Sequence, residues 1–248
     1  MLDLIAHGAV AELRLNRPPA NALNPALVRD LIDALARVSA DGARGILLSG
    51  QPGIFSGGLD VPELLMLGRD SISAFWADFF ALMRALASSP VPVVAAIEGH
   101  SPAGGAVLAL HCDYRIGVEG SFRLGFNEVL VGLPVPATIL LALEDLVGSR
   151  RARDLAVRGR LVDMAEALEL GLVDELAKEG EVVAGACALA GELAALPSIA
   201  MNQTRLACKR RLLRALEQGN DADSAARYWF SQETQAAMRR LADRLAGG

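Results

Sequence analysis

Hydrophobic and polar residues alternate along the start of the chain, in MLDLIA and VAELRLN, on either side of a turn at His7 and Gly8. A period of two is typical of a half-buried strand, so we expect two strands joined by a turn. Two prolines in RPPANAL end this pattern, and Asn24-Pro25 begins a helical periodicity that continues to about Ser39. GARGILLSG then predicts a third strand, which leads into the loop QPGIFSGGLDVPEL.

The same order of elements recurs further along the chain. We expect a helix from about Ile72 to Ala87, after which SSPVPVVAAIEG supplies a second buried strand, another glycine loop and another helix. CDYRIGVEGSFRLGFNEVLVGLP adds two short strands. The units repeat at roughly 40 to 50 residues without strong self-similarity. The remainder is expected to be largely helical from LPS at 196–198 onward, ending with a helix over 223–246.

Composition narrows the class of protein. The 248 residues suffice for one large domain, and 52% hydrophobic against 21% charged residues is an ordinary globular composition with a slight apolar surplus, which favours an oligomer. A formal net charge of −5, with Lys178 and Lys209 as the only lysines, argues against a nucleic-acid partner. The basic run CKRRLLR at 208–214 is predicted to be a solvated face or a subunit interface, with contact to an anionic ligand as the alternative.

Cysteine spacing and hydropathy bear on the compartment. Cys112, Cys187 and Cys208 are widely spaced, which fits a reducing compartment and neither a disulfide framework nor a zinc site. The first residues lack the layout of a signal peptide. The most apolar later stretch, 129–143, contains two prolines and is shorter than the roughly 20 residues that span a bilayer. We therefore expect a cytoplasmic protein without a membrane partner.

GHSPAGGAVLAL at 99–110 places a pair of glycines at the start of an apolar helix. Neither GxGxxG nor GxxxxGK[ST] occurs there and no lysine is near, so a phosphate loop is poorly supported. Ser101 lacks the GxSxG context of a serine hydrolase, and none of the three histidines stands in a recognisable partner motif. Small residues at a helix N-terminus leave backbone N–H groups accessible, which suits a developing oxyanion.

A second loop, FSGGLD at 55–60, has the same order of a strand end, two glycines and a helix start near Asp60. Alone, either loop is more often a tight turn than a binding site. Together, two loops that each offer one N–H are the minimum for a two-donor oxyanion hole.

Five stretches of the chain together resemble one family. They are, in order, RPPANALN, GIFSGGLDVPEL, PVVAAIEGHSPAGGAVLALHCDYRI, LGFNEVLVGLP and GRLVDMAEALELGLVDEL. Their order and spacing, over essentially the full chain, are similar to those of the enoyl-CoA hydratase/isomerase, or crotonase, family. The resemblance implies an α/β fold with a crotonase-like spiral core of ββα turns over residues 1–196. It also implies a C-terminal helical region over 197–248 that builds homotrimers, often paired as hexamers.

The resemblance further implies an acyl-CoA thioester substrate, whose carbonyl oxygen binds between the backbone N–H groups of Leu59 and Gly104. Hydratases of the family use two glutamates, whereas this sequence has Val107 in the place of the first and Glu128 in the place of the second. One carboxylate suffices to isomerise a 3-enoyl-CoA to a trans-2-enoyl-CoA, because it can take a proton from C2 and return it to C4. The surroundings of Glu128 resemble those of the mitochondrial-type 3,2-trans-enoyl-CoA isomerases.

A glutamate base of this kind is expected in an apolar pocket, where desolvation raises its basicity. The candidate walls are Val107, Val129, Leu130 and Leu133. Glu63 and Glu98 are less favoured alternatives for the base, and Glu144 is expected in solvent.

For coenzyme A the family uses mostly backbone and apolar contacts. The matching positions are Ala20, Ala22, Ser56, Gly58, Leu59, Asp60, Val61 and Gly104. Asp60 is equally well explained as a helix cap. His100 and Ser101 could touch the ligand without transferring a proton. No metal is implied, and no cofactor beyond the coenzyme A moiety of the substrate.

Two further motifs have plain structural interpretations. CDYR is expected to contain a buried Cys112 and a strand-edge Asp113 with Arg115. The aromatic cluster at 228–230 is expected to pack or to contact another subunit, with an acyl tunnel as the alternative.

Other functions stay open on the sequence alone. The same oxyanion hole serves hydration, thioester hydrolysis or decarboxylation in other members of the family, because one scaffold supports many reactions. A non-catalytic member that binds acyl-CoA or RNA is the alternative from another class. Acidic charge and scarce lysine disfavour RNA, and the two loops together with Glu128 disfavour an inactive member.

Overall fold

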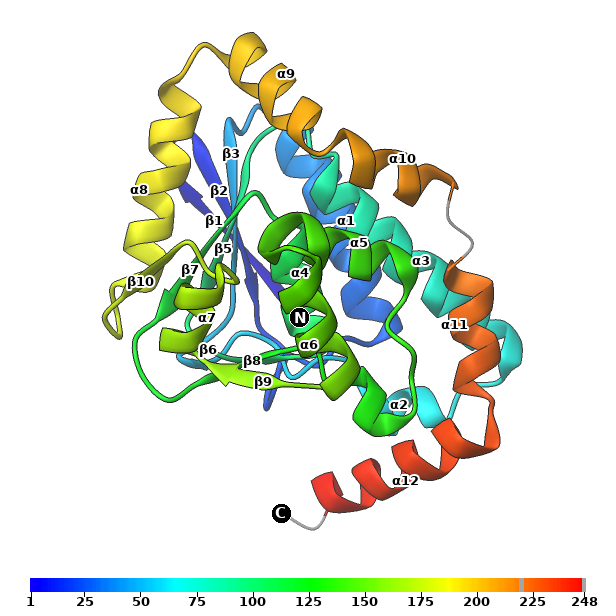
Figure 1. Cartoon of the computed structure of the whole chain (residues 1–248). Coiled ribbons are helices and arrows are strands. Elements are labelled where there is room, and N and C mark those ends of the chain that lie inside the picture. Colours follow the sequence, from blue (N-terminus) through cyan, green and yellow to red (C-terminus); the bar gives the residue numbers. More distant parts are fainter. Residues whose placement is uncertain (219–220, 247–248) are drawn as a thin grey trace.

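The strands form two sheets in the computed structural model, which describes residues 1–218 and 221–246 (Figure 1). The larger sheet has the order β1 (Leu2–His7), β2 (Val10–Leu15), β3 (Gly45–Ser49), β5 (Val93–Ile97), β7 (Tyr114–Val118) and β10 (Glu175–Ala177). The smaller sheet has the order β4 (Gly53–Ile54), β6 (Gly99–Pro102), β8 (Arg123–Gly125) and β9 (Leu161–Asp163). Pairs β1–β2 and β8–β9 are antiparallel, and the other neighbours are parallel.

From β3 to β8, consecutive strands alternate between the sheets. β3, β5 and β7 lie in the larger sheet, and the strands that follow each of them, β4, β6 and β8, lie in the smaller one. These are the ββα turns that the sequence predicts. The stretch at 99–102, expected within a loop, is strand β6 instead. It pairs with β4 so closely that a Cβ on Gly99 would lie 1.9 Å from the carbonyl carbon of Gly53.

Helices lie between many of these strands and after the last of them, β10. They are α1 (Pro25–Ala40), α2 (Val61–Leu65), α3 (Arg69–Ala87), α4 (Gly104–His111), α5 (Ala137–Val147), α6 (Ser149–Arg158), α7 (Met164–Leu170), α8 (Val182–Ala195), α9 (Ser198–Cys208), α10 (Arg210–Gln218), α11 (Asp221–Trp229) and α12 (Gln232–Ala246). A 3-10 turn, η1 (Glu128–Val131), follows β8. As the sequence predicts, α1 begins at Pro25, and the side chain of its N-cap residue Asn24 accepts a hydrogen bond from the N–H of Leu27.

Both faces of the larger sheet are covered, and its central strands β3 and β5 are accordingly buried throughout. On one face Leu47 and Val94 pack with Ala186 of α8. On the other, Ile46 and Val93 belong to the main core, which α1, α3 and α4 complete (Figure 1). The site described below lies on the side of this main core.

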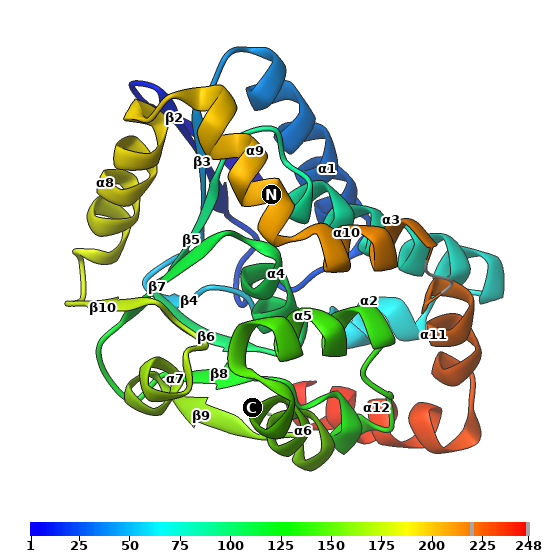
Figure 2. The same ribbon diagram turned by 45° about the horizontal axis from the view of Figure 1, so that its top comes forward.

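The last four helices follow the outside of the helical layer (Figures 1 and 2). α10 contacts α3 and α5, α11 contacts α3, and α12 contacts α2 and η1. The helix expected over 223–246 is in fact two, because the chain turns after Trp229 and Ser231 caps α12 by accepting a hydrogen bond from the N–H of Thr234. The division between residues 196 and 197 stays a prediction, and positions 219–220 and 247–248 of its second part lie outside the described residues.

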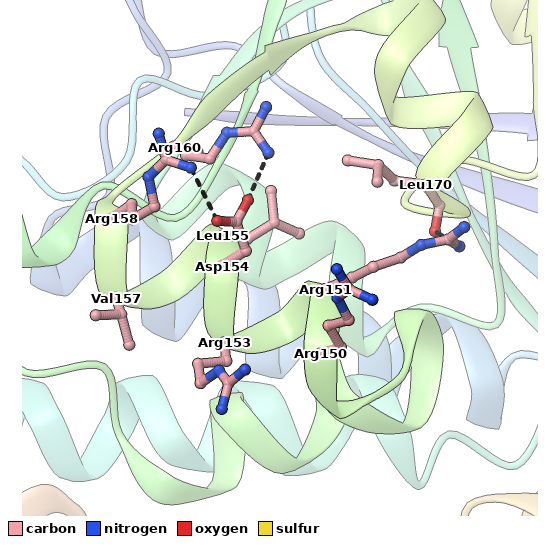
Figure 3. A pocket seen from close by; sticks show the side chains of 9 residues that line it. All are labelled: Arg150, Arg151, Arg153, Asp154, Leu155, Val157, Arg158, Arg160 and Leu170. Carbon is pink, nitrogen blue, oxygen red and sulfur yellow. Dashed lines mark hydrogen bonds and ion pairs between the residues drawn. The ribbon is translucent and has the colours of Figure 1, made fainter.

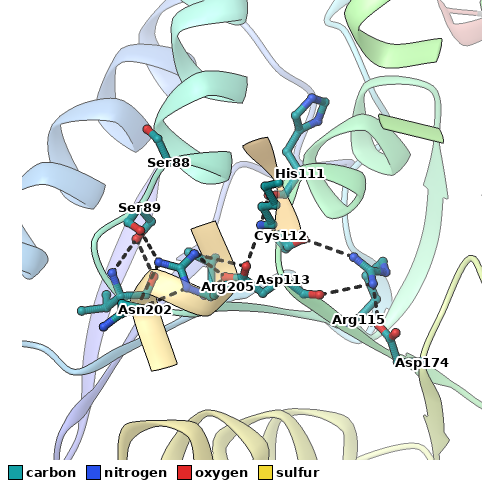
Figure 4. A network of polar contacts seen from close by, with 12 residues as sticks. Ser88, Ser89, His111, Cys112, Asp113, Arg115, Asp174, Asn202 and Arg205 are labelled. Atoms are coloured by element: carbon teal, nitrogen blue, oxygen red, sulfur yellow. Dashed lines mark hydrogen bonds and ion pairs between the residues drawn. The ribbon is translucent and has the colours of Figure 1, made fainter. Parts of the chain in front are cut away.

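A buried ion cluster fastens α9 and the residue after it to the larger sheet. Figure 4 shows Asp113 and Arg205 of this cluster. The carboxylate of Asp113 lies 2.6 Å from the ammonium of Lys209 and 3.1 Å from the guanidinium of Arg205. Burial lowers the pKa of Lys209, while Asp113 acts against this shift. Lys209 therefore points inward to Asp113. It belongs neither to a solvated face or subunit interface nor to a contact with an anionic ligand, the interpretations that the sequence offered for the basic run at 208–214.

The CDYR motif has the structural role expected of it. Cys112 is buried, and the buried guanidinium of Arg115 pairs at 2.7 Å with Asp174, just before β10 (Figure 4). The N–H of Val93 donates to Asp113. These contacts join neighbouring strand ends.

Of the helices within 1–218 and 221–246, none is by itself long and apolar enough to cross a bilayer. The pair α8 and α9 meets the criteria of length and composition only when taken together, across a bend of 114°.

Candidate active site

An apolar cavity of about 260 Å³ lies where the two glycine loops meet η1 and α12. Its lining consists of Gly57, Leu59, Val61, Trp76, Phe79, Pro102, Ala103, Gly104, Val107, Asn127, Glu128, Val131, Leu133, Pro134, Pro136, Ile139, Met238, Leu241 and Leu245. Within this described lining, Glu128 is the one side chain that titrates. The cavity therefore contains a single carboxyl group in hydrocarbon surroundings.

The two loops touch through their glycines. A Cβ on Gly104 would lie 3.2 Å from the Cα of Gly58 and 3.1 Å from Cδ1 of Leu23. Gly58 also has φ of +86°, a conformation that favours glycine. Glycine at these two positions is what allows FSGGLD and SPAGG to lie side by side.

The backbone N–H of Leu59 is free to point toward the cavity side of its loop. The N–H of Leu23 donates to the carbonyl of Gly58 (2.7 Å), and the N–H of Asp60 donates to the carbonyl of Leu23 (3.0 Å). These two hydrogen bonds form a parallel β-bridge between Leu23 and Leu59. In a parallel bridge, the residue that lies between the two hydrogen-bonded neighbours directs its own N–H away from the partner strand. Leu59 is that residue, and it lines the cavity.

The N–H of Gly104 is available for a different reason. Gly104 is the first residue of α4, and the first N–H groups of a helix have no acceptor within the helix. Ala103 before it has φ of +46° and ψ of −117°, which L residues rarely adopt. Its N–H donates to the carbonyl of Gly125 (2.8 Å), which holds this turn in place. Strain of this kind costs about 1–3 kcal/mol and is typical of functional sites.

Glu128 begins η1, directly after the short strand β8 and two connecting residues. Its Oε2 is shielded from solvent and has no hydrogen-bond partner within the described chain. Burial raises the pKa of Glu128 to about 7, while a hydrogen bond with its own backbone acts in the opposite direction. A carboxyl group with such a pKa is matched to accepting and returning protons near neutrality.

Two of the four residues that the sequence predicts to line the pocket of Glu128 do not line it. Val107 and Leu133 line the cavity, but Val129 and Leu130 do not. In a 3-10 turn residues i and i+3 eclipse each other, so Val131 shares the face of Glu128 while the two residues between them point outward. Val129 and Leu130 pack against Gly159, where an added Cβ would lie 2.8 Å from Cγ of Leu130.

The alternative glutamates lie elsewhere. Glu63 is 2.9 Å from the guanidinium of Arg17 and accepts a hydrogen bond from Asn24, so its carboxylate is already paired. Glu98 does not line the cavity, although burial raises its pKa. Glu144 lies near the exposed Arg211. Of these four glutamates, Glu128 alone lines the cavity.

The residues matched to coenzyme A contacts divide into two groups. Leu59, Val61 and Gly104 line the cavity, and Gly58 lies against Gly104. The remaining positions, Ala20, Ala22, Ser56 and Asp60, do not line it.

This second group builds the loop. The hydroxyl of Ser56 donates to the carbonyl of Asn21 (2.8 Å) and accepts from the N–H of Gly58 (3.2 Å). Asp60 caps α2 and lies 2.6 Å from the guanidinium of Arg17. The carbonyl of Ala20 accepts from the N–H of Gly57. Contact of these residues with coenzyme A stays a prediction.

Sequence reasoning missed the contribution of α12. Met238, Leu241 and Leu245 line the cavity, and their spacing of three and four residues places them on one helical face, a signal present in the sequence. Within the aromatic cluster at 228–230, Trp229 packs inside the protein, whereas Tyr228 is exposed. Trp229 is buried behind Trp76, with ring centroids 6.5 Å apart, and is not part of the lining.

A second, open groove of about 520 Å³ runs along α6 (Figure 3). Five arginines line it together with Asp154, whose carboxylate accepts hydrogen bonds from Arg158 and Arg160. None of the predicted site residues lies there. The apolar cavity, rather than this larger groove, therefore unites the candidate chemistry.

In the part of the chain that the structure describes, no group of three or more His, Cys, Asp or Glu side chains could hold a metal ion.

Comparison with known proteins places these features in context. The sequence profile described as "Enoyl-CoA hydratase/isomerase" matches residues 6–245. The chain is 32% identical over 221 residues to human "Enoyl-CoA delta isomerase 1, mitochondrial", covering 88% of this chain and 73% of the relative. It is 37% identical over 195 residues to a "Putative enoyl-CoA hydratase" of Thermus thermophilus, covering 77% of this chain and 76% of that protein.

Solved structures agree with these sequence matches. The crystal structure of human mitochondrial delta3-delta2-enoyl-CoA isomerase superposes with a TM-score of 0.94 at 29% identity, covering 99% of this chain and 98% of that one. The expected crotonase-like α/β fold is thereby confirmed.

Proposed function

Because the chain belongs to the enoyl-CoA hydratase/isomerase family and is thus a crotonase-family acyl-CoA enzyme, we propose that it converts 3-enoyl-CoA to trans-2-enoyl-CoA. The observation that carries the proposal is the single carboxyl group of the cavity. Glu128 lies in an apolar lining whose α4 wall contributes Val107, where the two-glutamate hydratases have an acid.

The reaction begins with polarisation of the thioester. Its carbonyl oxygen accepts hydrogen bonds from the N–H groups of Leu59 and Gly104. Removal of a proton from C2 moves negative charge onto that oxygen, so these donors stabilise the dienolate more strongly than the substrate. The dipole of α4 adds to this effect, because its positive end lies at Gly104.

Glu128 carries the proton between the two carbons. Its carboxylate removes the proton from C2, and the electrons of the C2–H bond form the C1–C2 double bond of the dienolate while the carbonyl π electrons move onto the oxygen. The protonated carboxyl then gives the proton to C4, which bonds it with the electrons of the C3–C4 π bond. The C1–C2 π electrons move to C2–C3, the carbonyl re-forms, and Glu128 is again a carboxylate. A positioned base of this kind contributes about 10²–10⁴-fold to rate. The apolar walls keep water away from the dienolate.

Hydration is the second candidate, because several relatives carry hydratase names, among them the Thermus thermophilus protein. Addition of water needs one group to activate the water and another to supply a proton to C2. The cavity lining offers one titrating group, which supports isomerisation over hydration.

A direct assay tests the proposal. The purified protein is mixed with a 3-enoyl-CoA and with crotonyl-CoA in separate reactions. We expect the ultraviolet absorbance of a conjugated thioester to rise in the first reaction and to persist in the second. Rapid loss of that absorbance from crotonyl-CoA, without isomerisation of the 3-enoyl-CoA, would instead support hydration.

We propose a homotrimer or hexamer as the assembly. Exposed apolar side chains on α9 and just before it, Ile199 and Leu196, support this proposal. Light scattering of the purified chain should give three or six times the mass of 26.1 kDa, and a monomer would contradict it.

A further inference from the structure

Thr234, in the first turn of α12, is a polar residue buried against the turn that carries Glu128. It is fully buried, and its hydroxyl donates to the carbonyl of Gly132 (2.6 Å), a residue 102 positions away in the chain. The two backbones also approach closely, because a Cβ on Gly132 would lie 3.1 Å from the Cα of Thr234. The start of α12 is thus fastened to the end of η1.

Gly132 ends η1 in a left-handed conformation with φ of +74°. Its carbonyl and the N–H of Leu133 are the two ends of one planar peptide group. The N–H of Leu133 donates to the carbonyl of Glu128 (3.1 Å). One rigid unit therefore connects the hydroxyl of Thr234 with the backbone of Glu128.

The carboxyl group of Glu128 depends on this turn for its position. Its Oε2 has no hydrogen-bond partner in the described chain, and the hydrogen bond that lowers its pKa is with its own backbone. The turn η1 has four residues, none of them fully buried, and short 3-10 turns have poor hydrogen-bond geometry. Contacts from other elements are therefore needed to hold the turn, and Thr234 supplies one.

We propose that Thr234 is a positioning residue for Glu128. Its hydrogen bond to Gly132 holds the turn, so the carboxylate reaches C2 and C4 of the substrate only while α12 is docked. The same helix supplies Met238 and Leu241 to the wall of the acyl cavity. Enclosure of the acyl group and placement of the base are thereby coupled. The inference rests on the proposed function, because it takes Glu128 as the base.

Capping of α12 does not explain the hydroxyl of Thr234. Ser231 is the capping residue, since its hydroxyl accepts from the N–H of Thr234 (3.2 Å). The hydroxyl of Ser231 also donates to that of Thr234 (2.9 Å), whose own proton goes to Gly132. Loss of either hydroxyl weakens the start of α12, but only loss of the Thr234 hydroxyl frees the carbonyl of Gly132.

Hydrogen exchange tests the support of the turn without requiring turnover. T234V keeps the shape of the side chain and removes the hydroxyl, T234S keeps the hydroxyl, and S231A removes the cap alone. Exchange is followed by mass spectrometry on peptides that cover 128–133 of the intact protein. We expect these peptides to exchange about threefold to tenfold faster in T234V, which is the range for one net hydrogen bond. In T234S and S231A they should exchange as in the wild type.

Kinetics with a 3-enoyl-CoA show whether the turn places the base. We expect kcat and kcat/KM of T234V to fall together by about tenfold, less than the hundredfold of a 1 Å misplacement. T234S and S231A should keep the wild-type rate. In the E128Q background T234V should cost no further activity, because no base is left to position. T234A removes the same hydroxyl and replaces T234V if valine prevents folding.

A merely structural role gives different results. Equal losses of kcat in S231A and T234V, or a raised KM with unchanged kcat in T234V, would overturn the inference. Unchanged exchange of 128–133 in T234V would do the same. Isomerisation by the wild type with full activity in T234V refutes only this inference. Faster exchange in T234V, without isomerisation by the wild type, refutes only the proposed reaction.

Discussion

Gly104 and Gly58 approach each other so closely that a Cβ added to Gly104 would lie 3.2 Å from the Cα of Gly58. Gly104→Ala should therefore push the two loops apart and misplace the N–H groups of Leu59 and Gly104. We expect kcat/KM to fall by about tenfold to hundredfold, less than complete loss of a donor, which costs about 10²–10³. Steady-state kinetics with a 3-enoyl-CoA measure this effect, and unchanged kinetics would contradict the role of the loop contact.

Gly191→Ala is the matched control. Gly191 lies within α8, and a Cβ there would meet nothing within 4 Å. Because alanine favours a helix interior over glycine, the free energy of unfolding should rise by about 0.5–1 kcal/mol. Urea denaturation measures this change, and the catalytic constants should stay those of the wild type.

Glu128→Gln removes the proposed proton carrier while keeping the size of the side chain. We expect isomerisation to fall by at least about 100-fold, the lower range for a positioned base. Glu144→Gln, near the exposed Arg211, is the control and should leave the rate unchanged. Full activity in Glu128→Gln would refute the proton-transfer role.

The raised pKa of Glu128 predicts the pH dependence of activity. The base must be deprotonated in the free enzyme, and its pKa is about 7. The value of kcat/KM should therefore rise with pH and level off above about 7. A profile that is flat from pH 5 to 9 would show that another group limits the reaction.

The same pKa predicts how stability changes with pH. From the ordinary value of 4.5 up to about 7, folded Glu128 keeps a proton that the unfolded chain has lost. The free energy of unfolding should accordingly fall as pH rises through this window, by about 3 kcal/mol in total. Urea denaturation measures the free energy of unfolding of the wild type and of Glu128→Gln over this pH range. The pH dependence of the variant reports all other groups, so the difference between the two proteins should show the fall that Glu128 causes.

Val107→Glu restores a second acid to the α4 wall. Two nearby carboxyl groups disfavour joint ionisation, so the pH profile of isomerisation should move upward and its rate at pH 7 should fall. Slow hydration of crotonyl-CoA should appear. Val107→Gln, similar in shape and uncharged, should not hydrate. If the wild type hydrated crotonyl-CoA as fast as Val107→Glu does, the lack of an acid at position 107 would not explain a preference for isomerisation.

Local patterns predicted much of the fold. Asn24 and Pro25 placed the start of α1, because a helix cap uses only neighbouring residues. Strand β6 escaped prediction, since GHSP has no alternating pattern and forms a strand through its pairing with β4 on one side and β8 on the other. Likewise, CKRRLLR gave no sign that Lys209 would reach Asp113, a partner almost a hundred residues away in the chain.

The candidate site was predictable to the extent that it consists of backbone and motif. Gly104, Leu59 and Glu128 were named from short stretches, and the structure brings their elements around one cavity. The outward turn of Val129 and Leu130 follows from the 3-10 geometry of η1, which the apolar run did not indicate. Met238 depends on the docking of α12, which no local pattern specifies.

The cavity is assembled from segments that leave the ribosome at different times. Leu59 and Gly104 are synthesised well before Met238 and Leu241, which supply the wall from α12. A nascent chain can thus form the loop contact long before it can enclose an acyl group. Competence to bind the acyl chain should appear late and abruptly during synthesis, so stalled chains that end before residue 232 should fold around the sheet yet fail to retain an acyl-CoA.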